Sequence, residues 1–402
     1  RFKRRYILKI VLILGLTMLM LGILGASAQP EEVWNKTFGG SGIDLGSQAQ
    51  ETEDGGYILV GSTESYGAGR EDAWLIKTDS NGNELWNRIY GGPKEDNGYS
   101  VQKTEDGGYI TVGATKSYGS GDSDAWLIKT DAAGNKQWDK TFGGRDIDEG
   151  RSVLQANDGG YIIAGLTRSF GAGDSDAWLI KTDPSGKEQW NRTFGGPGYD
   201  AGWAVDKTND GGYIITGSTE SYGPDGSSNS WLIKTNSTGI TQWEKTFGGS
   251  AWDGCRAVRE TKDGGYILVG DTQSFSAGAQ DVWVIKTDPS GKEQWNKTYG
   301  GSGYDWGFSI QQTNDSGYII AGSTESYGLL VTTSGPEKRI PGNAWLIKTD
   351  SNGNELWNTT FGGKGTDGAY SIQETKAGGY IIGGSTTSYG NKSVDAWLIR
   401  VN

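Results

Sequence analysis

Histidine is absent from the 402 residues of the chain, and cysteine occurs once, as Cys255. Without histidine the chain has no Ser–His or Cys–His nucleophile pair and no imidazole ligand for a metal. A single cysteine excludes a disulfide within the chain, so we expect Cys255 to be a small buried residue. These absences favour a binding or structural protein over an enzyme, and paired carboxylates are the hydrolytic arrangement that the composition still allows.

Methionine is limited to two residues and proline to eight, whereas glycine reaches 68 and tryptophan 17. A chain that is poor in helix formers and rich in glycine and aromatic residues indicates many short strands joined by tight turns. Its length suffices for one large all-β domain or two smaller ones.

The first 28 residues differ from the rest. A basic start from Arg1 to Arg5 precedes an apolar run from Ile10 to Leu24, and small residues follow from Ala26 to Ala28. This pattern is typical of a secretory signal peptide, with an uncleaved N-terminal anchor as the alternative. We therefore expect residues 29–402 to form one mature domain that is secreted or held at the cell surface, without inserting into the membrane itself.

The charge of the chain narrows the choice of partner. Residues 1–28 hold five basic and no acidic residues, so the net charge of −12 becomes −17 for residues 29–402. A negative charge of this size opposes nucleic acid and anionic membrane as partners and leaves an extracellular glycan or protein. Asn-x-Ser/Thr acceptors would permit N-glycosylation at Asn35, Asn191, Asn236, Asn296, Asn314, Asn358 and Asn391.

Two series of tryptophans divide the chain into seven units. The first begins each W-x-x-[TI]-[FY]-G-G segment, at Trp34, Trp86, Trp138, Trp190, Trp243, Trp295 and Trp357. The second stands in each D-A-W-L-I-K-T-D-like segment, at Trp74, Trp126, Trp178, Trp231, Trp283, Trp345 and Trp397. The first series is spaced by 52 or 53 residues except for a last interval of 62. Such a period is typical of a propeller, and the two rings of each unit are expected to fill the wedges between neighbouring sheets.

Each unit is predicted to contain four strands, and the second complete unit is representative. Its D-G-G turn at Asp106 joins two alternating runs, which is a strong hairpin signal because glycine accepts a positive φ. A D-x-x-G turn from Asp131 to Gly134 joins the last two strands. The four predicted strands are Tyr99–Thr104, Tyr109–Thr115, Ala125–Thr130 and Gln137–Phe142.

The two ends of the repeat are complementary. Residues 33–38 form a lone fourth strand, and the chain ends just after a third strand, Ala396 to Val401. Pairing the two would complete a seventh unit and leave no open sheet edge. We therefore predict an all-β, seven-bladed β-propeller with four-stranded blades, closed by the N-terminal strand.

The repeat resembles the SBBP-type repeat of secreted bacterial and archaeal proteins. The resemblance lies in T-F-G-G-x-G-x-D-x-G, in G-G-Y-I-x-x-G-x-T and in D-A-W-L-I-K-T-D-x-x-G-x-x-x-W, and it covers nearly all of residues 33–402. It implies a seven-bladed propeller with an extracellular life, and it implies no shared catalytic activity.

Aspartates recur at one register between the fourth strand of each unit and the first strand of the next. A ring of carboxylates is one way to hold a hard cation such as Ca²⁺. Alternatively, each carboxylate accepts backbone N–H bonds and fixes its own loop, and repetition in every unit favours this second interpretation, so no cofactor is predicted. We call these residues the ring aspartates: Asp44, Asp96, Asp148, Asp200, Asp253, Asp305 and Asp367.

Positions that change from unit to unit carry more information about function. Beside the ring aspartates the chain gathers aromatic and arginine side chains, on the face that carries the longer, more variable loops, here called the top face. They suit a planar or sugar-like ligand through stacking and bidentate hydrogen bonds, or else they fill the top of the central channel. The candidate ligand-binding residues are Tyr99, Arg151, Trp203, Trp252, Arg256, Trp306, Phe308 and Tyr370.

These observations predict an extracellular or cell-surface binding or adhesion module that recognises a glycan or protein on its top face. Two alternatives stay open: a structural propeller of the cell envelope without a small ligand, and a carboxylate-dependent enzyme acting on glycans. The 62-residue interval marks an insertion, Leu329 to Gly342, in a top loop of the sixth blade. It is either a partner contact or a tolerated excursion.

Overall fold

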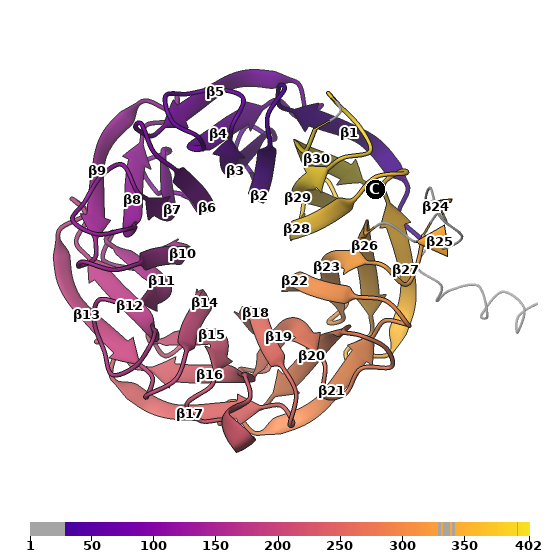
Figure 1. Cartoon of the computed structure of the whole chain (residues 1–402). Coiled ribbons are helices and arrows are strands. Elements are labelled where there is room, and N and C mark those ends of the chain that lie inside the picture. The colour runs from indigo at the N-terminus through magenta and orange to yellow at the C-terminus, as the bar shows by residue number, and fades with distance from the viewer. Residues whose placement is uncertain (1–28, 329–330, 333–337, 340–341, 392) are drawn as a thin grey trace, which may run out of the picture.

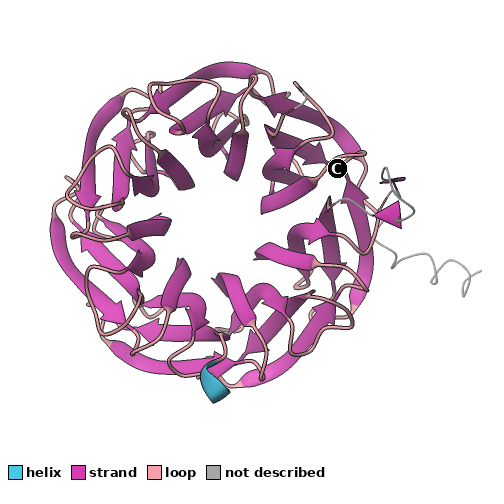
Figure 2. Cartoon of the chain, in the orientation of Figure 1, coloured by secondary structure: helices cyan, strands magenta, loops and turns pink. Residues whose placement is uncertain are grey.

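A computed structural model describes residues 29–328, 331–332, 338–339, 342–391 and 393–402. Seven four-stranded antiparallel sheets stand around a central axis, as Figure 1 shows. Strands make up nearly all of the regular structure in Figure 2, which also shows a short 3₁₀ turn, η1 (Pro224–Gly226). The predicted signal segment and most of the insertion lie outside the described residues, and the described part contains no helix long and apolar enough to cross a membrane.

The strands of each blade run in order from the axis to the outside. The innermost are β2 (Asp44–Glu51), β6 (Asp96–Lys103), β10 (Asp148–Gln155), β14 (Asp200–Lys207), β18 (Asp253–Glu260), β22 (Asp305–Gln312) and β28 (Asp367–Glu374). The second are β3 (Tyr57–Thr63), β7 (Tyr109–Thr115), β11 (Tyr161–Thr167), β15 (Tyr213–Thr219), β19 (Tyr266–Thr272), β23 (Tyr318–Thr324) and β29 (Tyr380–Thr386).

The outer half of each blade contains the third and fourth strands. The third are β4 (Asp72–Thr78), β8 (Asp124–Thr130), β12 (Asp176–Thr182), β16 (Asn229–Thr235), β20 (Asp281–Thr287), β26 (Asn343–Thr349) and β30 (Asp395–Val401). The outermost are β5 (Glu84–Tyr90), β9 (Lys136–Phe142), β13 (Glu188–Phe194), β17 (Thr241–Phe247), β21 (Glu293–Tyr299), β27 (Glu355–Phe361) and β1 (Glu32–Phe38). Two short strands, β24 (Val331–Thr332) and β25 (Lys338–Arg339), pair within the insertion.

The closure predicted from the two ends is confirmed. Strand β1 pairs antiparallel with β30, with Trp34 opposite Arg400 and Phe38 opposite Ala396. The seventh blade therefore takes three strands from the C-terminus and its outermost strand from the N-terminus. In Figure 1 the indigo β1 lies beside the yellow β30.

The innermost strands begin earlier than the sequence suggested. The ring aspartates, expected in loops, are the first residues of these strands, and Asp96 starts β6 three residues before the predicted Tyr99. The reason is that each aspartate position already pairs with the last threonine of the second strand, as Asp96 does with Thr115.

Tryptophans fill the wedges between blades, as predicted. In the wedge between the third and fourth blades, Trp231 packs in one cluster with Leu179 and Val205, and the half-buried Trp190 covers its outer side. Trp126, Trp231, Trp283, Trp345 and Trp397 are among the largest fully buried side chains. Because aromatic rings bury large apolar areas, these residues replace the compact core that a ring of separate sheets lacks.

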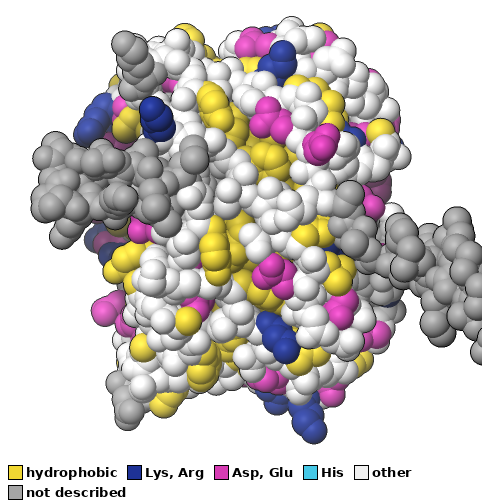
Figure 3. Space-filling model, turned by 90° about the vertical axis from the view of Figure 1, so that its right-hand side faces the viewer, with side chains coloured by type: hydrophobic (Ala, Val, Ile, Leu, Met, Phe, Trp, Pro, Cys, Tyr) yellow, Lys and Arg dark blue, Asp and Glu magenta, His cyan; other side chains and the backbone are white. Residues whose placement is uncertain are grey.

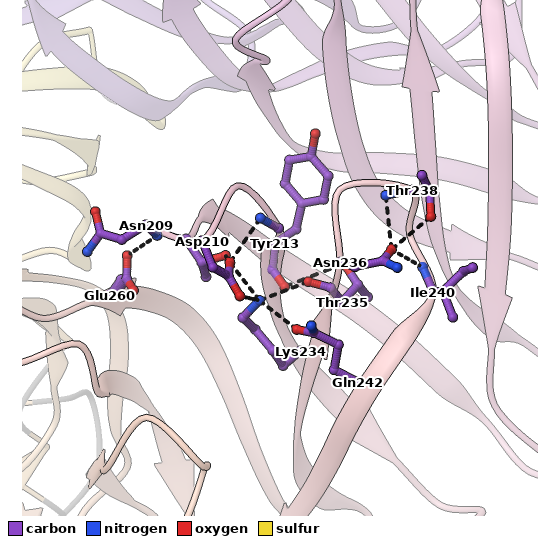
Figure 4. A network of polar contacts seen from close by, with 12 residues as sticks. Asn209, Asp210, Tyr213, Lys234, Thr235, Asn236, Thr238, Ile240, Gln242 and Glu260 are labelled. Carbon is purple, nitrogen blue, oxygen red and sulfur yellow. Dashed lines mark hydrogen bonds and ion pairs between the residues drawn. The ribbon is translucent and has the colours of Figure 1, made fainter.

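The face opposite the top face, here called the bottom face, carries the turns between the first and second strands. In six of the blades a buried lysine forms an ion pair with the aspartate of this turn. In the fourth blade, Lys234 lies 2.8 Å from a carboxylate oxygen of Asp210 and also donates to Gln242, as Figure 4 shows. Burial alone would raise the pKa of Asp210, but hydrogen bonds from Lys234 and Thr208 hold that pKa down to about 2. The seventh blade has Ala377 and Arg400 instead, and Arg400 donates to the backbone carbonyl of Tyr380.

In six of the seven blades, backbone N–H groups at the inner edge donate to side chains of the blade before. The N–H of Val101 donates to Gln48 Oε1 at 2.8 Å, and that of Ala49 donates to Ser371 Oγ at 2.9 Å. Two residues further along the strand, the N–H of Glu374 donates to Gln311 Oε1 at 2.8 Å. Side chains of neighbouring blades therefore occupy hydrogen-bonding groups that a free strand edge would leave open.

Removing residues 29–40 should lower the melting temperature by many degrees, because the loss of β1 exposes the edge of β30. A chain that begins at residue 29 is the matched control. Thermal unfolding of the two mature proteins checks the prediction, and equal melting temperatures would show that closure adds no stability.

Candidate functional site

A β-bulge in each innermost strand positions the candidate residues. The pairing of β6 with β7 shifts between Gly98 and Ser100, so Tyr99 is the extra residue, and every other blade shows the same shift. Such a residue takes no place in the ladder and is free to point elsewhere. We call these seven residues the bulge ring: Ser47, Tyr99, Arg151, Trp203, Arg256, Phe308 and Tyr370.

Glycine opposite the bulge is a steric requirement. A Cβ on Gly113 of β7 would lie 1.7 Å from the carbonyl oxygen of Asn97, which the bulge pushes toward it. Equivalent glycines face equivalent carbonyls in the other blades, for example Gly165 and Glu149 at 1.8 Å. The repeated glycine of the second strand therefore makes room for the bulge. The bulge in turn takes one residue out of the ladder, so the side chain of that residue can vary.

One half of the bulge ring forms a cation–aromatic stack. The guanidinium of Arg151 lies 4.4 Å from the ring centroid of Tyr99 and 5.1 Å from that of Trp203. Arg151 also forms an ion pair with Glu149, and Trp203 Nε1 donates to Ser218 Oγ at 3.3 Å. Burial raises the pKa of Tyr99 to about 12, so its phenol stays protonated at physiological pH.

The other half is built around Arg256. Its Nε donates to Asp271 Oδ1 at 2.9 Å, and its guanidinium lies 5.3 Å from the ring centroid of Phe308 and 6.0 Å from that of Trp252. Phe308 in turn meets Tyr370 edge to face at 5.0 Å. All of these ring residues are half-buried, so they neither seal the axis completely nor project freely into solvent.

Six of the eight predicted residues belong to the bulge ring, and two lie outside it. Trp252 precedes β18 and still reaches Arg256. Trp306, the second residue of β22, stacks instead on Tyr304, with centroids 5.6 Å apart and an interplanar angle of 11°. Trp306 was grouped with the ring because it is close in sequence. Side chains alternate along a strand, however, and that of Trp306 lies against Tyr304 instead.

The ring aspartates fix the loops that join neighbouring blades. Asp44 is fully buried and accepts bonds from the N–H of Gly40 at 2.8 Å, from Ser65 Oγ at 2.5 Å and from Thr63 Oγ1. Its equivalents are bonded in the same way, as Asp96 is to Gly92 N–H in the loop before it and to Ser117 Oγ of its own blade. Among the described residues, no group of three or more His, Cys, Asp or Glu is placed to hold a metal ion.

Sequence reasoning missed the acids that hold the two arginines. Asp271 is completely buried in β19, where the other blades carry Ser, Ala or Leu at the same register, and it also accepts a bond from Gln280. Burial raises the pKa of Asp271, against the opposing effect of Arg256. Comparing the seven units position by position would have singled out this aspartate.

Comparisons with known proteins assign no family. No family model matches the chain. A curated relative, the regulatory protein FlaEY of Caulobacter vibrioides, is 25% identical over 185 residues, which cover 40% of this chain and 19% of that protein. The chain thus matches about a fifth of the length of that relative.

Solved structures share the fold at low sequence identity. The Pan2 WD40 domain of Neurospora crassa aligns with a TM-score of 0.51 and 9% identity over 88% of both chains. BBS1N in complex with ARL6DN aligns with a TM-score of 0.51 and 10% identity over 92% of this chain and 96% of that one. YCF48 bound to D1 peptide aligns with a TM-score of 0.50 and 11% identity over 94% and 98%. These likenesses show the propeller fold alone.

Replacing Asp124 by Asn should raise the free energy of unfolding at pH 7. Burial and the nearby Asp148 raise the pKa of Asp124 above 3.8, so the ionised carboxylate costs stability above that pH. Two blades already carry Asn229 and Asn343 at this register. In denaturant titrations the gain should disappear as the pH falls to about 3.8, and a loss of stability at pH 7 would contradict the argument.

Replacing Arg256 by Ala should destabilise the protein more than replacing Arg151. The first change leaves Asp271 with a side chain that is 0% exposed, whereas Glu149 keeps 18% exposure. We expect a cost of roughly 2–3 kcal/mol for the first, since Arg256 itself is partly exposed, and about 1 kcal/mol or less for the second. Adding Asp271→Ser, the residue of four other blades, should restore much of the loss, as chemical denaturation can measure.

Proposed function

We propose that this protein is a secreted or cell-surface binding module whose bulge ring holds a protein ligand at the top face. The proposal rests on a contrast between two kinds of position in the innermost strands, which have the same structure in all seven blades. The scaffold positions repeat, while the bulge residue changes from blade to blade and supplies aromatic rings and arginines. Trp, Tyr and Arg are the side chains that most often dominate binding energy at protein interfaces.

The geometry of the ring supports this assignment. Arg151 and Arg256 are each stacked on aromatic rings and held by an acid, so their orientation is fixed before a ligand arrives. Side chains that are ordered in advance lose less entropy on binding. Half-buried aromatic surface beside them offers apolar area that a ligand would remove from water.

The charge and the fold relatives agree with a protein ligand. On the side of the ring seen in Figure 3, charged side chains of both signs are dispersed among neutral and hydrophobic ones, with no broad basic surface in the described part seen there. Two solved structures of similar fold are complexes, YCF48 with D1 peptide and BBS1N with ARL6DN. Membership of the SBBP-type repeat family, secretion and glycosylation belong to the same proposal and are implied by the repeat, the first 28 residues and the acceptor sequences.

A neutral glycan is the second candidate. Glu149 and Asp271 neutralise the two arginines, so the ring presents stacking surfaces with little net charge, which suits pyranose rings as well. Adhesion to a cell-surface polymer would use the same residues.

The test is a double variant, Trp203→Ala with Trp252→Ala, screened against a displayed peptide library and a glycan array. Truncating an anchor tryptophan costs on the order of 2 kcal/mol, or roughly 30-fold in Kd, so peptides selected on the parent should lose most of their affinity. Trp306→Ala, which lies outside the bulge ring, is the control and should bind as the parent does. Full binding by a correctly folded double variant would move the site elsewhere, and selective binding to glycans would favour the second candidate.

A further inference from the structure

A second site lies on the axis, between the bulge ring and the bottom face. A cavity of about 470 Å³ is lined by residues that follow the bulge in five innermost strands and by turn residues of the bottom face. Its walls include Gln48, Asp206, Arg259, Gln311 and Gln373. Residue 259 lies three positions beyond the bulge residue Arg256, so the cavity is about 10 Å further along the axis.

The bonds that join the blades decide which atoms face this cavity. The Oε1 atoms of Gln48, Gln311 and Gln373 accept the backbone N–H groups of Val101, Glu374 and Glu51. An amide whose oxygen faces a backbone donor must turn its NH₂ group the other way, so the assignment of oxygen and nitrogen is fixed by the backbone. Among the described residues, no group accepts a hydrogen bond from these three NH₂ groups.

The carboxylates of the cavity wall are already engaged. Asp206 uses one oxygen for the N–H of Lys207 at 3.0 Å and the other for that of Glu260 at 3.3 Å. Glu260 accepts the N–H of Asn209 at 2.8 Å, as Figure 4 shows. Backbone N–H groups thus occupy three of the four carboxylate oxygens of Asp206 and Glu260.

Within the part of the chain that the structure describes, the cationic groups of the wall are bonded only to neutral acceptors. Arg259 donates one hydrogen bond, to the carbonyl of Val258 at 2.9 Å. Lys207 donates to Asn157 Oδ1 and Lys262 to the carbonyl of Thr313, each at 3.1 Å. Together these three cations outnumber Asp206 and Glu260, so the wall is net positive in a chain whose net charge is −12.

We propose that this cavity binds an oxyanion, the carboxylate or phosphate group of a ligand, through the NH₂ groups of Gln48, Gln311 and Gln373 and the guanidinium of Arg259. A cluster of convergent donors that includes a planar guanidinium matches the several lone pairs of an oxyanion. A metal cation would be repelled by the three cationic side chains of the wall, and a sugar hydroxyl would use only part of its donors. The site goes beyond the bulge ring, because its chemistry is polar and cationic rather than aromatic.

Two sources can supply the same group. A small free anion would enter the cavity by itself, whereas the terminal carboxylate of a peptide would reach it along the axis while the preceding residues contact the bulge ring. The probes are therefore inorganic phosphate, citrate, triglycine and triglycine amide, each titrated into the mature protein by calorimetry.

Two variants test the wall. Arg259→Gln introduces the residue that four other blades carry at this register and should fold normally. Gln311→Glu keeps the acceptor for the N–H of Glu374 but replaces the NH₂ donor by an anionic oxygen. Each should weaken anion binding at least about tenfold, because hydrogen bonds to a charged group are among the strongest in a protein. Gln137→Glu, on the exposed outermost strand β9, adds the same charge away from the cavity and is the control.

Binding of phosphate or citrate by the parent and the control, lost in both variants, supports the site and a small free anion. Binding of triglycine but not its amide, with the same losses, supports the site and a peptide terminus. The proposal is overturned if the folded parent binds none of the four probes, or if Arg259→Gln and Gln311→Glu bind them as the parent does. Neither result depends on whether a ligand of the bulge ring has been found.

Discussion

The unpaired inner edge of each blade is the constraint on which the rest of this propeller depends. An innermost strand has a partner on one side only, and the N–H groups of its other side meet side chains of the preceding blade. Buried N–H groups must find acceptors. Serine and glutamine side chains of the preceding blade supply them, as Ser371 does for Ala49 and Gln311 for Glu374. The seven separate sheets are thereby tied into a ring by polar bonds as well as by the apolar wedges.

This constraint also explains which positions vary. Residues after the bulge accept a neighbour's N–H in several blades, as Ser100 and Gln102 do, and the glycine of the second strand makes room for the bulge. The bulge residue itself has neither duty. It therefore diverges without damage to the fold, from Ser47 through Tyr99 to Trp203, while the same bonds occupy the Oε1 atoms of the glutamines.

Much of this architecture could be predicted from the sequence, because the same pattern of strands and turns recurs in seven units. The tryptophan spacing gave the number of blades, and the missing fourth strand at the C-terminus gave the closure by β1. The bulge could not be foreseen, since one extra residue in an alternating run reads as a loop. For this reason the ring aspartates were expected in loops, and Trp306 was grouped with the bulge residues although it stacks on Tyr304. Asp271 was missed because a single residue in a buried strand has no pattern of its own.

The exceptions to the repeat separate scaffold from function. Some are compensated within the fold. Gln102 accepts an N–H of the next blade, but Leu154 at the same position of the third blade cannot. The N–H of Lys207 that is left over is accepted by Asp206 of its own blade. Others have no such role. The fifth blade alone carries Arg256 at its bulge, the buried Asp271 that holds it, and Arg259 in the wall of the axial cavity. Both arginines belong to β18, one in the bulge ring and the other in the wall of the axial cavity. A ligand lying along the axis would therefore contact both arginines on one strand. In this arrangement the seven blades build the fold, and the fifth blade supplies the side chains for binding.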